Sequence, residues 1–299
     1  MGVTMGYDLL ALCRLEGVSW HFLYGGDVNE MAVEMAKLSL WLVSLSRERP
    51  FSFLDDRLVC GDSLLGLTSL EQLRTLHLDP ARARRRAGGM SESGFDLWGA
   101  VSRALGEAEG IRRELAEHPL RDVRDAAYKA RLLAQAEATE RPLAVIADAM
   151  VGAALACGEG AERELLEVAA EAARALREAD PGERERRLRA MAELATARLE
   201  AGRPEGAFAR RPTHWPLVFP EVFERGGFDA VVGNPPFLGG QKLTGAFGVP
   251  YREFLVRWVG RGKRGSADLV AYFLLVAHAI LSPNGSGPRA PGADRGPAR

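Results

Sequence analysis

The chain has 299 residues and a formal net charge of -1, so no overall basic field draws it to nucleic acid. Its 47% apolar content is typical of a soluble globular protein, and its three cysteines stand far apart. No run of about 18 apolar residues and no signal-peptide pattern occurs, so we expect no metal site, no disulfide framework, no membrane span and a cytoplasmic location.

A strand followed at once by a helix is predicted near the N-terminus. Residues 20–27 form a strand candidate that ends on Asp27, and apolar side chains then recur at helical spacing from Met31 to Leu42. A carboxylate in this position either accepts hydrogen bonds from ribose hydroxyls or caps the helix, a role for which Asn29 is also placed. The residues themselves leave the two roles of Asp27 open.

A second strand is predicted over residues 57–61. It closes on Gly61, Asp62 and Ser63, a combination typical of a tight turn. An aspartate that only shapes the turn is the ordinary interpretation of Asp62.

A large helical insertion is predicted over residues 70–211, where the composition shifts to Ala, Glu, Arg and Leu. Breaks at residues 158–160 and 181–182 divide it into long amphipathic helices, which we expect to pack as hairpins projecting from the sheet. Pairs such as Glu183 with Arg187 would then lie on solvent-exposed faces.

The motif that carries chemistry follows a third predicted strand, a short apolar run at residues 228–232 that we expect to be buried. The sequence Asn-Pro-Pro-Phe comes next and cannot continue a sheet, because proline lacks the backbone donor. It resembles the catalytic motif of amino-methyltransferases, which use S-adenosylmethionine to methylate a planar amino nitrogen. The predicted catalytic residues are Asn234, Pro235, Pro236 and Phe237.

The resemblance assigns each residue a task. An adenine amino group is a poor nucleophile, since its lone pair is delocalised into the ring. The side-chain oxygen of Asn234 and the carbonyl of Pro235 would accept its two N–H groups and direct the lone pair at the methyl donor. Phe237 would stack on a base that has left the duplex. A proline turn with an ordinary core phenylalanine is the alternative.

The residues after the motif suit the handling of a substrate. Residues 238–245 are rich in glycine and polar side chains, as in a loop over a substrate, and helices are predicted over residues 251–259 and 267–281. We expect the second helix to be buried, because it is apolar on nearly all sides. Contacts with DNA phosphates are assigned to Lys242, Arg261, Lys263 and Arg264, and a solubilising turn is the alternative for the last three.

Three blocks, around Asp27, Asp62 and Asn234, occur in the order found in adenine-specific DNA methyltransferases of restriction-modification and phage-exclusion systems, and the chain resembles that family over residues 20–281. The resemblance implies double-stranded DNA as partner and S-adenosylmethionine as cofactor, bound by Asp27, Asn29, Asp62 and Ser63. Methylation of cytosine or of protein glutamine, and a non-catalytic remnant acting as a helical interaction or DNA-binding module, are the alternatives.

The implied fold is α/β, a partial Rossmann-like methyltransferase sheet with a large helical insertion. We expect core at residues 1–69 and 212–283, the insertion at 70–211, and a disordered tail at 284–299. The family's glycine-rich cofactor turn is not found before Asp27, nor its Pro-Gly-Gly turn after Leu281. We therefore expect a fragment that alone binds the cofactor weakly or not at all and that an upstream or downstream polypeptide would complete.

Overall fold

The computed structural model describes residues 23–43, 54–87 and 123–283, together with residues 99, 103, 106–108, 110–115 and 118. Predictions for residues 20–22 and 284–299 lie outside these ranges. The elements in chain order are β1 (Gly25–Asp27), α1 (Glu30–Val43), β2 (Leu58–Cys60), α2 (Leu70–Thr75), α3 (Pro80–Ala87), α5 (Val123–Ala156), η4 (Gly158–Gly160), α6 (Ala161–Arg177), α7 (Pro181–Leu199), α8 (Trp215–Val218), α9 (Pro220–Glu224), α10 (Gly240–Phe247), α11 (Val249–Phe254), the π-helix η5 (Leu255–Val259) and α12 (Leu269–Ile280).

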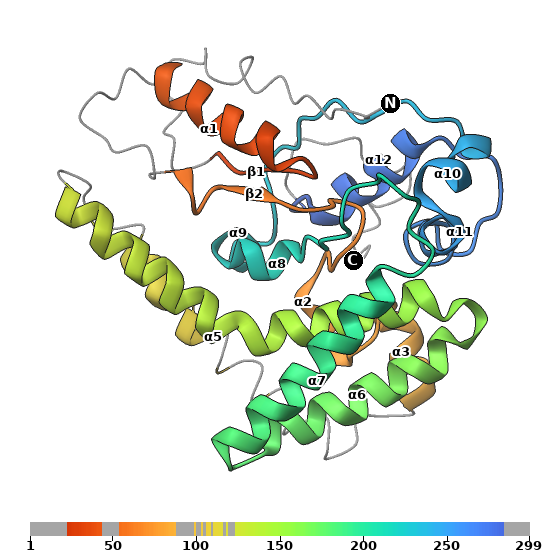
Figure 1. The fold of residues 1–299 in the computed structure, drawn as a ribbon, viewed down its shortest axis with the longest axis horizontal. Helices are drawn as coiled ribbons and strands as arrows, with labels where there is room; N and C mark the ends of the chain where they lie inside the picture. The colour runs from red at the N-terminus through yellow and green to blue at the C-terminus, as the bar shows by residue number, and fades with distance from the viewer. Residues whose placement is uncertain are drawn as a thin grey trace, which may run out of the picture.

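The two strands form a parallel pair between two layers of helix. Gly25 lies opposite Leu58 and Asp27 opposite Cys60. Successive side chains of a strand point to opposite faces, so Leu58 packs with the buried residues of α1 while Val59 packs against the aromatic cluster of α8 and α9. Figure 1 shows the strands between α1 and α8–α9, with α6 and α7 further away. This is a small α/β core in a chain that is otherwise mostly helical.

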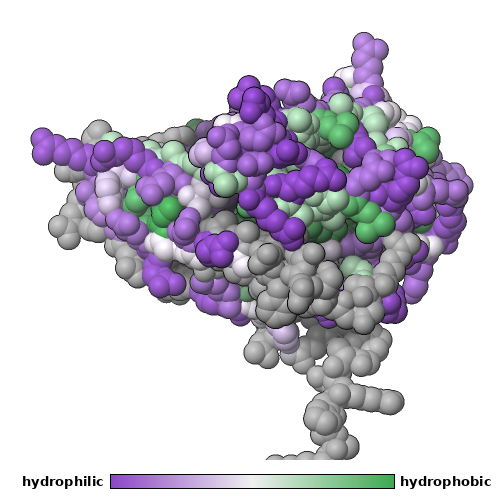
Figure 2. Space-filling model, turned by 90° about the horizontal axis from the view of Figure 1, so that it is seen from below, coloured by the Kyte–Doolittle hydropathy of each residue, from purple (hydrophilic) through white to green (hydrophobic). Residues whose placement is uncertain are grey.

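Most described residues of the insertion are helical, as its periodicity predicts; the exceptions are the breaks between helices and residues 200–211, which follow the end of α7. α7 begins after Asp180, whose side chain accepts from the amide of Glu183 at 2.6 Å, and the predicted pair of Glu183 with Arg187 forms at 3.3 Å. Pro142 lies inside α5, which bends midway in Figure 1, as expected where proline removes a backbone donor. Seen from below, the side of α6 and α7, the surface is mostly hydrophilic with separate apolar spots (Figure 2).

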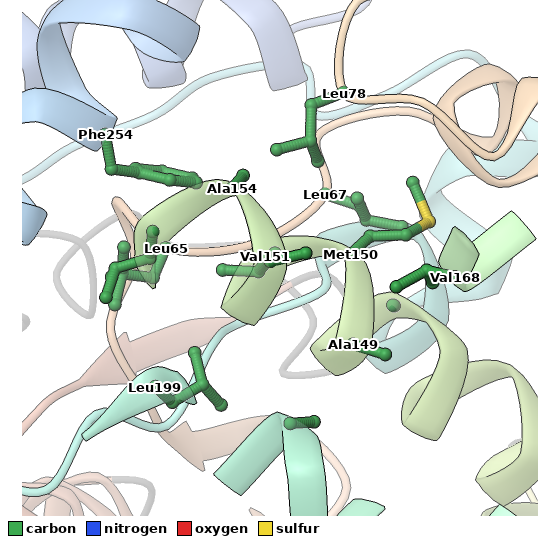
Figure 3. Close-up of a cluster of buried hydrophobic side chains, with 14 of the residues drawn as sticks. Leu65, Leu67, Leu78, Ala149, Met150, Val151, Ala154, Val168, Leu199 and Phe254 are labelled. Atoms are coloured by element: carbon green, nitrogen blue, oxygen red, sulfur yellow. The ribbon is translucent and has the colours of Figure 1, made fainter. Parts of the chain in front are cut away.

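The insertion also supplies the main hydrophobic core. Met150, Val151 and Ala154 of α5 lie close to Leu65 and Leu67 from the segment after β2, and to side chains of α6, α7 and α11 (Figure 3). Each of these five residues is at least 97% buried. The helices are therefore not a separate projection, since the segment after β2 reaches into their centre.

Two expectations for the C-terminal part are wrong. Residues 229–239 form no strand, and Val231 and Val232 are 40% and 60% exposed. Among the described residues, Phe228 forms a bridge with Leu281, but no segment pairs along residues 229–237. A strand needs a neighbour that satisfies its backbone groups. α12 is buried on one face only; on the other, Leu274 is 53% exposed.

The segment after β2 holds the chain where it returns from the insertion. The amide of Asp62 donates to the carbonyl of Arg211 at 2.7 Å, and the amide of Thr213 donates to the carbonyl of Leu65 at 2.7 Å. His214 accepts from the amide of Leu67 at 3.3 Å through Nδ1, and its Nε2 lies 3.0 Å from a carboxylate oxygen of Asp148 in α5. These contacts dock the insertion on the core.

Gly66 is required for this docking. Its φ is +146°, and a Cβ there would lie 2.1 Å from the carbonyl oxygen of Thr213. We expect Gly66→Ala to lower the free energy of unfolding by about 2–4 kcal/mol, measured by urea denaturation. Gly245→Ala in α10 is the control, because a methyl group there meets nothing within 4 Å. Equal stability of the two variants would contradict the close packing at Gly66.

Candidate functional site

Two carboxylates lie at the carboxyl ends of the two parallel strands. Asp27 is the last residue of β1, and Asp62 follows the end of β2 by two residues. The amide of Gly61 donates to the carbonyl of Asp27 at 2.9 Å, which ties the two strand ends together. Carboxyl ends of parallel strands are where open α/β sheets bind ligands.

Asp27 is buried and has one oxygen without a partner. Its side chain is 4% exposed; Oδ1 accepts from the amide of Asn29 at 2.7 Å, while Oδ2 has no hydrogen-bond partner among the described residues. Burial raises the pKa of Asp27, against the lowering effect of the Asn29 amide. A buried acceptor left unpaired is costly, and a ligand hydroxyl would satisfy it.

Asn29, rather than Asp27, caps α1. The side-chain oxygen of Asn29 accepts from the amide of Met31 at 3.0 Å. The cap therefore occupies the Asn29 side chain and leaves Asp27 Oδ2 to other partners.

Asp62 is held by several donors. Its Oδ1 accepts from the amides of Leu64 and Leu65 at 2.9 and 3.4 Å, and the hydroxyl of Tyr251 lies 2.9 Å from Oδ2 and 3.2 Å from Oδ1. Burial raises the pKa of Asp62, and these donors act in the opposite direction. The backbone carbonyl of Ser63 accepts from Trp215 Nε1 at 3.4 Å, and its half-buried side chain is beside this turn.

The Asn-Pro-Pro-Phe motif lies in an open segment. Asn234 is exposed, Pro235 and Pro236 are half-buried, and Phe237 is 83% exposed. No hydrogen bond joins the Asn234 side chain to Asp27, Asp62 or another described residue. The structure thus places the two predicted cofactor carboxylates at neighbouring strand ends, while the asparagine that the sequence predicts to be catalytic is bonded to neither of them.

The open segment is anchored at both ends on α12. At one end, the amide of Phe228 donates to the carbonyl of Ile280 at 2.9 Å. At the other, the amide of Leu238 donates to Asp268 Oδ1 at 3.2 Å and its carbonyl accepts from the amide of Leu269 at 3.0 Å. The segment that carries the motif therefore runs from one end of α12 to the other.

The basic residues assigned to DNA are all exposed. Arg264 pairs with Glu253 at 3.3 Å, whereas Lys242, Arg261 and Lys263 have no carboxylate within ion-pair distance in the described ranges. Lys242 lies in the first turn of α10, the helix that follows the motif, and the other three lie on the loop before α12. Exposed cations of this kind are able to contact phosphates.

Two residues beside Asp62 were missed by sequence reasoning. Tyr251 comes from α11, and Arg210 lies under its ring with the guanidinium 5.7 Å from the ring centroid. No local pattern marks either residue, because the tyrosine contacts an aspartate 189 positions earlier in the chain.

A charged cleft lies elsewhere. It has a volume of about 570 Å³ and is bounded by α5, α7 and residues 209–218, with Arg112, Asp148 and His214 in its lining. None of the predicted site residues lines it. In the described ranges, no group of three or more His, Cys, Asp or Glu side chains is placed to hold a metal ion, and no helix is long and apolar enough to cross a bilayer.

Comparison with known proteins gives one family. The Eco57I restriction-modification methylase family matches residues 21–287, a range that includes both carboxylates, the insertion and the Asn-Pro-Pro-Phe motif. No curated protein and no solved structure matches the chain. Because the family match spans most of the sequence, the chain belongs to the Eco57I restriction-modification methylases.

Proposed function

We propose that the chain is the catalytic part of an adenine-specific DNA methyltransferase, which moves a methyl group from S-adenosylmethionine to the amino group of a flipped adenine in double-stranded DNA. The observation that carries the proposal is the buried Oδ2 of Asp27, which has no hydrogen-bond partner within the described ranges and lies at the same strand ends as Asp62. Among related functions, this site fits a ligand that brings hydroxyl and amino donors together, as an adenine nucleoside does.

Each carboxylate fits one part of the cofactor. Oδ2 of Asp27 would accept from a ribose hydroxyl, and Asp62 from the adenine amino group, with Ser63 beside it. The Asn29 side chain would act indirectly, by fixing the start of α1. When bound, the cofactor supplies an electrophilic methyl group.

The motif would act on the target base. The side-chain oxygen of Asn234 and the carbonyl of Pro235 would accept from the two N–H groups of the target, while Pro236 holds the turn. Phe237 offers its ring for stacking, and its 83% exposure argues against an ordinary core phenylalanine. Lys242, Arg261, Lys263 and Arg264 would contact the phosphates.

Separate polypeptides remain part of the proposal. The described residues form a sheet of two strands only, which is small for a methyltransferase core. The apolar side chains of residues 231–232 are exposed, and a completing chain would cover them. The expectation that the chain alone binds the cofactor weakly stays a prediction.

Asp27→Asn tests the cofactor assignment through two effects of opposite sign. The folded chain holds a proton on Asp27 at higher pH than the unfolded chain, so ionisation of this group costs stability as pH rises and the cost persists at neutral pH. We expect the variant to be more stable at neutral pH, with the difference vanishing in acid. We expect its binding of S-adenosylhomocysteine to weaken about 10- to 100-fold, because a charged acceptor is lost.

The measurements are urea denaturation across pH and ligand-observed NMR, which reaches millimolar dissociation constants. Asp229→Asn, at an exposed position, is the matched control. Unchanged ligand affinity in Asp27→Asn would rule out the cofactor role. Transfer of tritiated methyl groups to duplex DNA, followed by nucleoside digestion, then separates N6-methyladenine from methylated cytosine; a labelled cytosine would replace the adenine assignment.

A further inference from the structure

Tyr251 straddles the carboxylate of Asp62. Its hydroxyl oxygen lies 2.9 Å from Oδ2 and 3.2 Å from Oδ1, so it contacts both oxygens at once. On the other side, the amide of Leu64 donates to Oδ1 at 2.9 Å. Donors on two sides leave the carboxylate little freedom to rotate about its Cβ–Cγ bond.

The tyrosine is itself fixed. It is 2% exposed, and the ring of Phe247 stacks on it with 4.8 Å between centroids. Arg210 lies on the ring and donates to the carbonyls of Leu199 and Phe247 at 2.8 and 2.6 Å. The phenol therefore belongs to a frame that joins the end of α7 to α10 and α11.

The hydroxyl acts as a donor throughout the working pH range. Burial and the neighbouring Asp62 raise the pKa of Tyr251 well above its ordinary value. A carboxylate offers about four acceptor sites, and the hydroxyl and the amides leave at least one of them unused. The unused site lies on Oδ2, which accepts from the Tyr251 hydroxyl alone among the described residues, whereas Oδ1 also accepts from two amides.

We propose that Tyr251 is a positioning residue for Asp62, holding the carboxylate so that its remaining acceptor site selects a ligand with an exocyclic amino group. The inference rests on the proposed function, since it names the residue that makes the site specific for adenine in the cofactor. A freely rotating carboxylate would accept donors from many directions and would discriminate less.

The test compares two ligands, S-adenosylhomocysteine and its deaminated analogue S-inosylhomocysteine, which carries a carbonyl in place of the amino group. We expect the wild-type chain to bind the first more tightly by at least about tenfold, because the analogue leaves Asp62 facing an oxygen. Tyr251→Phe keeps the ring and its stacking. We expect it to weaken the first ligand about tenfold and the analogue little, so that the ratio of the two dissociation constants falls towards one.

Two further variants separate positioning from folding. Tyr272→Phe removes the hydroxyl of another buried tyrosine, 3% exposed in α12, and should leave the ratio unchanged. Phe247→Leu loosens the tyrosine without removing its hydroxyl and should reduce the ratio in the same direction by a smaller factor. Circular dichroism at the binding temperature shows whether each variant is folded. If Tyr251→Phe is unfolded, the ratio measured for Phe247→Leu decides the test.

The outcomes distinguish the two claims. If Asp27→Asn weakens binding but Tyr251→Phe weakens both ligands equally, or neither, the positioning role is wrong and the cofactor site stands. If the wild-type chain binds neither ligand, the proposed function fails for this chain and the positioning role fails with it. A loss of discrimination confined to Tyr251→Phe and Phe247→Leu supports both.

Discussion

Arg112→Ala is expected to lower the free energy of unfolding by about 3–5 kcal/mol. Arg112 and Glu140 form two hydrogen bonds, Nε to Oε1 and Nη2 to Oε2, each 2.9 Å long, and both side chains are 8% exposed. Removal of the arginine leaves a buried carboxylate without its countercharge. Urea denaturation followed by circular dichroism measures the loss.

The pH dependence identifies the cause. Burial already raises the pKa of Glu140, while Arg112 lowers it, so without Arg112 the pKa rises further. A carboxyl that holds its proton more tightly in the folded chain costs stability as pH rises through its pKa. The deficit of Arg112→Ala should therefore be larger at neutral pH than in acid.

Two control variants test whether the loss of stability comes from the buried charge. Arg141→Ala breaks an exposed pair with Glu185 and should cost at most about 1 kcal/mol. The double change Arg112→Met with Glu140→Leu removes both charges at similar volume and should recover most of the loss. A deficit that is independent of pH and persists in the double variant would mean that packing, rather than charge, holds these residues.

Asn234→Ala is expected to reduce methyl transfer by about 10²- to 10³-fold, the effect of removing one preorganised polar contact to a transition state. Asn234 is exposed and its side chain makes no hydrogen bond within the described ranges, so the variant should unfold at the same denaturant concentration as the wild type. Binding of S-adenosylhomocysteine should be unchanged as well. The rate is measured as tritium incorporated into duplex DNA.

The matched control is Asp229→Ala, in the same exposed segment but outside the motif. It should retain the wild-type rate. If Asn234→Ala also retained it, the asparagine would not orient the target nitrogen, and the motif would be no more than a turn.

The sequence is a good guide where structure depends on neighbours along the chain. Helical spacing predicts α1 over 31–42, close to its observed bounds Glu30–Val43. The break at 158–160 separates α5 from α6, and the break at 181–182 marks the first residues of α7. The turn at Asp62 was predicted as the end of a strand, and β2 ends two residues before it.

The sequence is a poor guide where the structure depends on contacts between segments that are far apart in the chain. The apolar run at 228–232 has the composition of a buried strand, yet a strand exists only with a partner, and Val231 and Val232 are exposed. For Asp27, spacing could not tell which residue caps α1, because the cap is the contact of the Asn29 side chain with the amide of Met31. Nor could it reveal Tyr251, whose partner precedes it by 189 residues.

The anchoring of residues 229–237 on a single helix has a thermodynamic consequence. Among the described residues, the backbone amides of this segment have no protein acceptor, while its two ends are bonded to opposite ends of α12. Its conformational free energy is therefore nearly independent of the hydrophobic core, and substitutions within it should leave global stability almost unchanged. Substitutions in this segment can therefore change the motif without unfolding the chain, and under the proposed function the entropy cost of ordering the segment opposes substrate binding rather than folding.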